Sequence, residues 1–356
     1  MAIERITSLI DKKLSQGYVA PVLTENDIII ATKNGILYSF HANSPKTFKW
    51  KLYFPYVKKN SNINMFLYGK IVFFIVDNVL HKIDTETGEI LWKKELKAPI
   101  RGKAALINNK LAILTIDNYM HVLNVKDGSY AWSYQNDVNV VRGLYSVSPT
   151  VSNNKIIAPF SNGELIAFNE DGKKLWNQKL NINLLDTQLT DITNAVVHNT
   201  ILVATNNSYV YGIDTESGSI LWSRPLQVKS VSSVVSYCNF SAHIKEQKVN
   251  SGIFFAITKN DKIIGIDVQN GETVWTTESH LTRNAQLFTS IIYSNTLWVM
   301  SNNGLMLAFP RFENVGKLFK IPLNVFHTPV FTNDKIYVTT EKNGVFFLKN
   351  KFVYYE

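Results

Sequence analysis

Seven histidines, 28 acidic residues and one cysteine are the side chains of this 356-residue chain that could bind a metal or carry acid–base and nucleophilic chemistry. The histidines are His41, His81, His121, His198, His243, His280 and His327. None of them stands two or four positions from another, so their spacing does not favour a metal site. The chain also lacks the G-x-S-x-G, P-loop and G-x-G-x-x-G motifs. We therefore expect no enzyme activity, no metal and no cofactor.

Cys238 is the only cysteine, so no internal disulfide can form and no oxidising compartment is required. We expect it to be a small buried strand residue. Next to it, the sixth repeat described below carries a long polar loop, Ser241–Asn250, and loops of this length are usually functional or mobile.

The formal net charge of +9 is spread along the chain, without a run of five basic residues. Nucleic-acid binding requires a clustered basic face, so no nucleic-acid partner is expected. The longest apolar run, Ile71–Val76, is far shorter than the roughly 18 residues of a membrane span. Met1–Gly17 lacks the profile of a secretory signal. We therefore expect one of two alternatives, a cytoplasmic protein or a protein whose leader has been removed.

One phrase recurs along the chain, an acid-led tight turn followed by a strand that ends on tryptophan. Its copies are Asp84–Trp92, Asp214–Trp222, Asp267–Trp275 and, more loosely, Asn124–Trp132 and Asn169–Trp176. These tryptophans and Trp50 stand 40 to 53 residues apart, and Phe319 takes the next position. Repeats of this length that carry several short strands are typical of propeller blades.

The residue types that recur within this phrase can be explained by structural roles. The glycine permits a backbone bend that side chains would strain. The tryptophan buries a large area between neighbouring blades, which contributes a few kcal/mol. The opening Asp or Asn can accept hydrogen bonds from its own turn. We therefore interpret the phrase as structural in every copy.

Each repeat divides into four strands, of which Ala104–Ile107, Ile71–Val76 and Leu165–Phe168 are examples of the first, second and third. Asn-Gly pairs at 34–35, 162–163, 303–304 and 343–344 predict type I′ turns, in which both residues take positive φ. The sequence thus predicts an all-β protein, an eight-bladed β-propeller of four-stranded antiparallel sheets. The blades are expected at 17–52, 62–97, 99–136, 145–180, 190–226, 228–278, 286–322 and 326–355.

We expect a single propeller domain over residues 17–356. Residues 1–16 form an N-terminal segment, in which Arg5–Leu9 could pair with the last blade and close the ring. An unclosed ring would expose two hydrophobic blade faces.

The phrase Ile83-Asp84-x-x-x-Gly88-x-x-x-Trp92 resembles the repeat named for pyrroloquinoline quinone, which occurs in quinoprotein dehydrogenases and in relatives that bind no cofactor. Over about residues 17–356 the chain is most similar to the BamB family of outer-membrane β-barrel assembly lipoproteins. Val141-Arg142-Gly143 with Ser146–Thr150 resembles the family passage before the fourth blade, and Leu189–Thr193 resembles the passage that opens the fifth. The repeat is specific for the fold and only weakly specific for function.

The resemblance implies a periplasmic scaffold at the outer membrane, which docks to the POTRA domains of BamA and assists outer-membrane protein folding. Carried over by position, the protein-binding residues are Asn139, Val141, Arg142, Asp191 and Thr193. Arg142 and Asp191 match the family motif and Val141 is an apolar replacement, whereas Asn139 replaces an apolar residue and Thr193 an acid. We expect a monomer, with unfolded outer-membrane proteins as a second class of partner. Residues 1–17 contain no cysteine for the family's lipid anchor, so membrane association would need an anchor that this chain does not show.

The residues themselves favour the same surface. In a four-stranded meander, the blade-to-blade crossings and the loops between second and third strands fall on one face. The crossings Tyr134–Tyr145 and Asn181–Asp191 are long, adjacent and mix apolar residues with single charges. An arginine beside apolar residues is typical of an interface anchor. The alternative is a local ion pair of Arg142 with Asp191 or Asp186.

Two other classes of function stay open at this point. A quinoprotein enzyme would hold calcium and the quinone at the ring centre, with a carboxylate base and often adjacent cysteines. The chain has no Cys-Cys pair, and its acids lie mostly in turns. A propeller that binds a soluble peptide or sugar in its central funnel is the other class.

Overall fold

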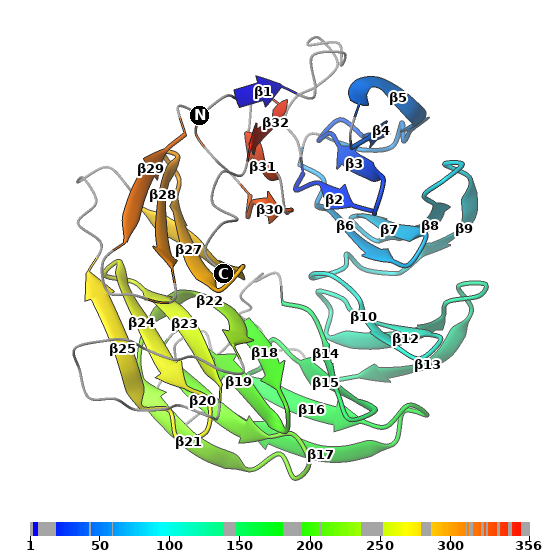
Figure 1. Ribbon diagram of the computed structural model, residues 1–356. Coiled ribbons are helices and arrows are strands. Elements are labelled where there is room, and N and C mark those ends of the chain that lie inside the picture. The colour runs from blue at the N-terminus through cyan, green and yellow to red at the C-terminus, as the bar shows by residue number, and fades with distance from the viewer. Residues whose placement is uncertain are drawn as a thin grey trace. The chain divides into compact units, whose positions relative to one another are not determined.

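The computed structural model contains eight four-stranded sheets, which we number 1 to 8 along the chain (Figure 1). It describes residues 3–5, 19–42, 44–58, 60–137, 147–180, 192, 194–206, 208–235, 252–278, 286–310, 312, 316–321, 324, 327–332, 335–340 and 344–349. Within sheets 1 to 7 each strand pairs with the next one along the chain. The predicted all-β architecture is confirmed, and the strands of each sheet lie within or close to the predicted blade boundaries.

The strands of the first four sheets are as follows. Sheet 1 contains β2 (Val22–Leu23), β3 (Asp27–Ala31), β4 (Ile36–His41) and β5 (Ser44–Tyr53). Sheet 2 contains β6 (Ile63–Tyr68), β7 (Ile71–Val76), β8 (Val79–Asp84) and β9 (Ile90–Glu95). Sheet 3 contains β10 (Ala105–Ile107), β11 (Lys110–Leu114), β12 (Tyr119–Asn124) and β13 (Tyr130–Gln135). Sheet 4 contains β14 (Thr150–Ser152), β15 (Lys155–Pro159), β16 (Glu164–Phe168) and β17 (Lys174–Lys179).

The remaining sheets follow the same plan. Sheet 5 contains β18 (Asn194–His198), β19 (Ile201–Thr205), β20 (Tyr209–Asp214) and β21 (Ile220–Pro225). Sheet 6 contains β22 (Val228–Val235), β23 (Ile253–Thr258), β24 (Lys262–Asp267) and β25 (Thr273–Glu278). Sheet 7 contains β26 (Leu287–Tyr293), β27 (Thr296–Ser301), β28 (Leu305–Pro310) and β29 (Lys317–Lys320). Sheet 8 contains β30 (Val330–Phe331), β31 (Lys335–Thr340), β32 (Gly344–Lys349) and β1 (Ile3–Arg5).

Sheet 8 joins the two ends of the chain. β1 pairs antiparallel with β32, with Ile3 opposite Leu348 and Arg5 opposite Phe346. The strand therefore covers residues 3–5, whereas pairing was predicted for Arg5–Leu9, of which residues 6–9 lie outside the described residues. The chain separates into two compact units, one of residues 1–97, 301–306 and 319–356 and the other of residues 98–300 and 307–318. That residues 17–356 act as a single domain stays a prediction.

The second strands of the sheets are mostly apolar, and in β23 neighbouring sheets cover both faces. Successive side chains of a strand point to opposite faces, and β23 shows the consequence. Ile253, Phe255 and Ile257 pack into one cluster with Leu287 and Val299 of sheet 7. The alternate residues of β23, Phe254 and Ala256, pack into another cluster with Trp222 and Val203 of sheet 5. Each fully buried phenylalanine contributes about 1.5–3 kcal/mol relative to an exposed one.

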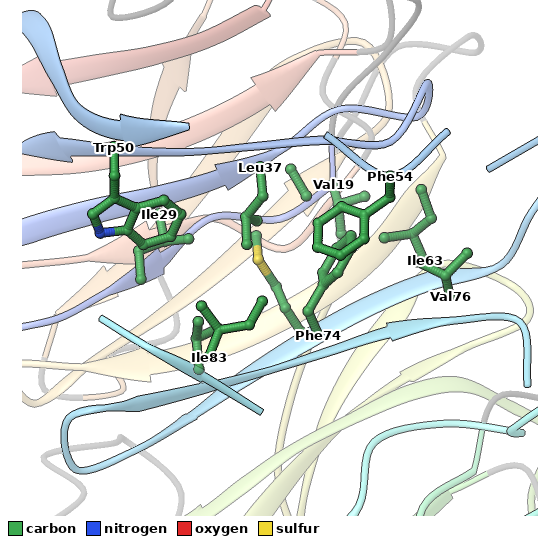
Figure 2. Packing of buried hydrophobic residues seen from close by; sticks show 12 residues of the cluster. Val19, Ile29, Leu37, Trp50, Phe54, Ile63, Phe74, Val76 and Ile83 are labelled. Carbon is green, nitrogen blue, oxygen red and sulfur yellow. The ribbon is translucent and has the colours of Figure 1, made fainter. Parts of the chain in front are cut away.

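The recurrent tryptophan lies against the glycine of the next sheet. In the first unit, Trp50 donates its Nε1–H to the Thr85 carbonyl at 2.8 Å. A Cβ on Gly88 would lie 2.8 Å from the Trp50 ring. The surrounding core joins sheets 1 and 2, with Trp50 at one end and Phe54 and Ile63 toward the other (Figure 2).

The second unit repeats this contact three times. A Cβ would lie 2.7 Å or less from the facing indole at Gly172 against Trp132, at Gly218 against Trp176 and at Gly271 against Trp222. The three indoles donate to the carbonyls of Glu170, Thr215 and Val268. The predicted packing role of the phrase is confirmed at these copies.

The hairpin turns differ from the prediction. At Asn34-Gly35, Asn162-Gly163 and Asn303-Gly304 only the glycine has positive φ, so these pairs do not form type I′ turns. Asn343 of the fourth pair lies outside the described residues. Gly35 instead donates to the Thr32 carbonyl at 3.1 Å and closes a wider loop. Both residues of Asn153-Asn154 do have positive φ, and this pair joins the first and second strands of sheet 4. Both residues of Ser294-Asn295, between the first and second strands of sheet 7, also have positive φ. The turns that fit type I′ are therefore made by pairs without glycine, in which asparagine tolerates this conformation.

Candidate docking site

All five residues predicted to bind a protein partner lie outside the described residues. They are Asn139, Val141, Arg142, Asp191 and Thr193. The structure instead describes the points at which their two segments leave and rejoin the sheets: Asn136 and Asp137, Val147, Leu180 and Ile192. The candidate site is therefore built from the residues that fix these four points, all in the second unit.

Each outer strand ends beside the turn that joins the second and third strands of its own sheet. In sheet 3, the Asn136 N–H donates to the Asn118 carbonyl at 3.0 Å. In sheet 4, the Leu180 N–H donates to the Gly163 carbonyl at 2.9 Å. The starts of both crossings and these turns thus lie at the same edge of their sheets, as the sequence analysis expected.

Asn118 holds the start of the first crossing. It lies in the turn before β12 with φ +61° and is fully buried. Its Nδ2 donates to the Asp137 carbonyl at 2.7 Å. Its Oδ1 accepts from the Ser161 N–H at 3.1 Å and from the Ser161 hydroxyl at 2.8 Å. The side-chain amide of Asn118 therefore connects the start of the first crossing to the turn of sheet 4.

The end of the first crossing is held by the segment that enters sheet 3. Ser148 Oγ accepts from the Lys103 N–H at 2.8 Å. Gly102 allows this approach, because a Cβ there would lie 2.8 Å from Ser148 Oγ. Beside them, the buried Arg101 donates from Nη1 to the Pro159 carbonyl at 3.1 Å. Backbone and side-chain contacts thus fix both ends of the segment that carries Arg142.

The second crossing leaves and returns through apolar anchors. Leu180 and Ile192 are fully buried in one cluster with Trp176. The Leu180 carbonyl accepts from the Tyr211 hydroxyl at 2.8 Å and from Asn206 Nδ2 at 3.4 Å. Burial of the Tyr211 hydroxyl raises its pKa. The ends of the segment that carries Asp191 are therefore also fixed by the core.

A carboxylate lies beside the first crossing. Glu164 Oε2 accepts from Asn136 Nδ2 at 2.9 Å and from Asn162 Nδ2 at 3.1 Å. Burial opposes ionisation of Glu164, but hydrogen bonds from Asn136, Asn162 and Asn177 outweigh it and lower the carboxyl pKa. Sequence reasoning missed Asn136 and Glu164. The available signal was that both depart from the residue types that other repeats carry at these positions.

The first unit contains a different titratable pair. Tyr56 and His81 Nε2 are 2.6 Å apart, and His81 Nδ1 is 3.1 Å from the Phe74 carbonyl. A carbonyl only accepts, so Nδ1 carries the proton and Nε2 accepts from the Tyr56 hydroxyl. Burial lowers the pKa of His81. Burial, with a smaller effect of Glu95, raises the pKa of Tyr56 to about 12.

Within the described part of the chain, no three histidine, cysteine or acidic side chains gather in a way that could hold a metal ion. Nor does that part contain a helix with the length and apolar character of a membrane span.

Known proteins resemble this chain in sequence and in structure. A family profile described as "Outer membrane protein assembly factor BamB" matches residues 64–277 and 169–311. The BamB of Moranella endobia (strain PCIT) is 24% identical over 314 residues, which cover 74% of this chain and 78% of the relative. The BamB of Yersinia pestis is 22% identical over 284 residues, which cover 75% of this chain and 66% of the relative.

The crystal structure of BamB from Moraxella catarrhalis matches with a TM-score of 0.74 at 14% identity and covers 98% of both chains. At this identity the likeness shows the fold. Together with the eight four-stranded sheets, it confirms the predicted eight-bladed β-propeller class.

Proposed function

Because the chain belongs to the family of the outer membrane protein assembly factor BamB, we propose that it is a non-enzymatic scaffold of the machinery that assembles β-barrels in the outer membrane. In this role it docks to the POTRA domains of BamA and assists outer-membrane protein folding and insertion. It acts on the periplasmic side of the outer membrane. Propeller folds serve many functions, so the proposal rests on family membership together with a surface suited to docking.

The observation that carries the proposal is the anchoring of the two crossings. Asn118 fixes the start of the first crossing at 2.7 Å from Nδ2 to the Asp137 carbonyl. Buried Leu180 and Ile192 flank the second crossing. A segment whose ends are held by a rigid core loses less conformational freedom on binding than an unanchored one, which favours affinity. This arrangement supports a docking role for Arg142 and Asp191.

The experiment is a charge reversal at the proposed contact. Purified Arg142→Glu/Asp191→Lys protein is compared with wild type for binding to the POTRA domains, by pull-down and by titration. We expect binding to be lost while the circular dichroism spectrum and the thermal midpoint stay unchanged. Loss of an interface anchor typically costs at least about 2 kcal/mol, or roughly thirtyfold in affinity.

A matched control carries the same exchange of charges elsewhere. Lys126 and Asp127 are exposed in the turn between the third and fourth strands of sheet 3, at the opposite edge from the crossings. Lys126→Glu/Asp127→Lys should bind as wild type. If the Arg142/Asp191 variant also binds as wild type, these residues are not the contact. If wild type itself does not bind, the proposed function is wrong.

A further inference from the structure

The chain departs from its own repeat at two positions near the first crossing. The first position is the residue that follows the outer strand and bonds to the turn of its sheet. In sheets 1, 2, 4, 5 and 7 it is an apolar residue, namely Phe54, Leu96, Leu180, Leu226 and Ile321, and all of these except the half-buried Leu226 are buried. In sheet 3 it is Asn136, with 7% of its surface exposed. A buried amide requires partners for its polar atoms, whereas the apolar residues do not.

The second position is the first residue of the third strand. In the other sheets the third strand begins on Ile36, Val79, Tyr119, Tyr209, Lys262, Leu305 and Gly344. In sheet 4 it begins on Glu164, the only acid among these eight strand starts. If these two residues contact each other, a single structural role can explain why both differ from the other repeats.

They do touch. Asn136 Nδ2 lies 2.9 Å from Glu164 Oε2 and 3.4 Å from Asn162 Oδ1. Asn162 Nδ2 donates to the same Glu164 oxygen at 3.1 Å. Asn162 Oδ1 also accepts from the Glu164 N–H at 3.2 Å. The amide of sheet 3 and the turn of sheet 4 thus hold one carboxylate in place.

The hydrogen bonds favour the charged form of this carboxylate without neutralising it. Burial disfavours ionisation, but hydrogen bonds from the amides of Asn136, Asn162 and Asn177, with a smaller effect of the Lys179 charge, lower the Glu164 pKa. Amides carry no net charge, so the negative charge remains. Lys179 stands opposite Glu164 in the sheet register, but the described residues form no ion pair with Glu164 within 4.0 Å. A carboxylate has about four acceptor positions, and three donors leave room for another.

We propose that Glu164 receives a lysine or arginine side chain of the docked protein, and that Asn136 and Asn162 are its positioning residues. The inference rests on the proposed docking function and names a specificity-determining contact within it. Glu164 is half-buried at the same sheet edge as the crossings. A fixed negative charge selects for a basic group and against an acidic one.

The test compares Glu164→Gln with wild type for affinity to the POTRA domains over a range of salt concentrations. Glutamine keeps the size of the side chain and removes its charge. We expect about a tenfold loss of affinity and a weaker dependence on salt, because one ion pair is lost. The control is Glu272→Gln, since Glu272 is an exposed carboxylate that accepts from Asn270 at the opposite sheet edge. It should bind as wild type.

Asn136→Leu tests the positioning role, because leucine is the residue type of other repeats at this position. Without the amide, the Glu164 pKa rises, so binding should be lost at a higher pH than in wild type when the solution is acidified. A merely structural role would not move this pH profile. Glu164→Lys should bind more weakly still, and an acidic substitution of the partner's basic residue should restore it.

The experiments distinguish failure of the Glu164 proposal from failure of the proposed docking function. If Glu164→Gln binds with wild-type affinity and salt dependence while Arg142→Glu/Asp191→Lys does not bind, the Glu164 proposal is wrong and the docking function stands. If wild type does not bind the POTRA domains, both are wrong.

Discussion

Replacing Gly88 with alanine tests whether the tryptophan–glycine contact holds neighbouring sheets together. Gly88 has φ +77°, and its Cβ would lie 2.8 Å from Cγ and Cδ2 of Trp50. The left-handed conformation costs a non-glycine residue about 1–2 kcal/mol. Forcing a methyl group into a packed contact adds about 1–3 kcal/mol. We therefore expect Gly88→Ala to lower the free energy of unfolding by about 2–5 kcal/mol.

Gly69 provides a control within the same sheet. It has φ +55°, but a Cβ there would meet no atom within 4 Å. Gly69→Ala should therefore cost only the backbone term, about 1–2 kcal/mol. Urea unfolding of the full chain measures both variants, with the slopes compared to check that the unfolding transition is unchanged. Equal losses of stability at Gly69 and Gly88 would refute the reasoning.

A second arm of the experiment removes the ring. In a Trp50→Leu background the methyl group of Gly88→Ala no longer meets the indole, so only the backbone term should remain. The double-mutant cycle should give a coupling energy of about 1–3 kcal/mol between the two positions. A coupling energy near zero would mean that the indole does not require the glycine.

Two further predictions concern pH and the buried amide. His81 is held neutral by burial, so its contribution to stability is complete above about pH 6.5. It is lost as pH falls toward the lowered folded-state pKa, because the unfolded chain then binds the additional proton. His81→Gln should flatten the decline of the urea midpoint between pH 7.5 and 5, and an unchanged decline would contradict the lowered pKa of His81. Asn118→Gly keeps the backbone conformation and leaves Ser161 without its acceptor, so it should cost about 1–3 kcal/mol in urea unfolding. A stability equal to wild type would show that another group replaces the amide.

The period of the tryptophan phrase is why the fold could be predicted from the sequence. A sheet that stacks between two others needs a second strand that is apolar on both faces, such as Ile71–Val76 or Ile253–Thr258. It also needs a glycine where the indole of the preceding sheet approaches, as at Gly88, Gly172, Gly218 and Gly271. Both demands recur along the chain, so they leave a periodic signal. The strands therefore fall within or close to the predicted boundaries.

Local turn geometry was predicted less well, because it depends on loop length as well as on residue type. Asn34-Gly35 has the sequence of a type I′ turn, yet only Gly35 has positive φ and its N–H donates to the Thr32 carbonyl, so the turn begins at Thr32. The candidate site could be predicted only in part, because its residues do not follow the repeat that reveals the fold. Averaging over repeats shows what they share, whereas Asn136 and Glu164 differ from the other copies. The roles of Arg142 and Asp191 stay predictions that rest on family resemblance.

The pairing of β1 with β32 has a consequence for how the molecule is made. Ile3 pairs with Leu348, so the two strands of this pair are separated by nearly the whole described chain. Closing so long a stretch of chain is entropically costly and slow. Sheet 8 therefore cannot be completed before β32 has been synthesised. A chain that ends before Gly344 releases β1 with a free edge, which marks an incomplete product for proteolysis or aggregation.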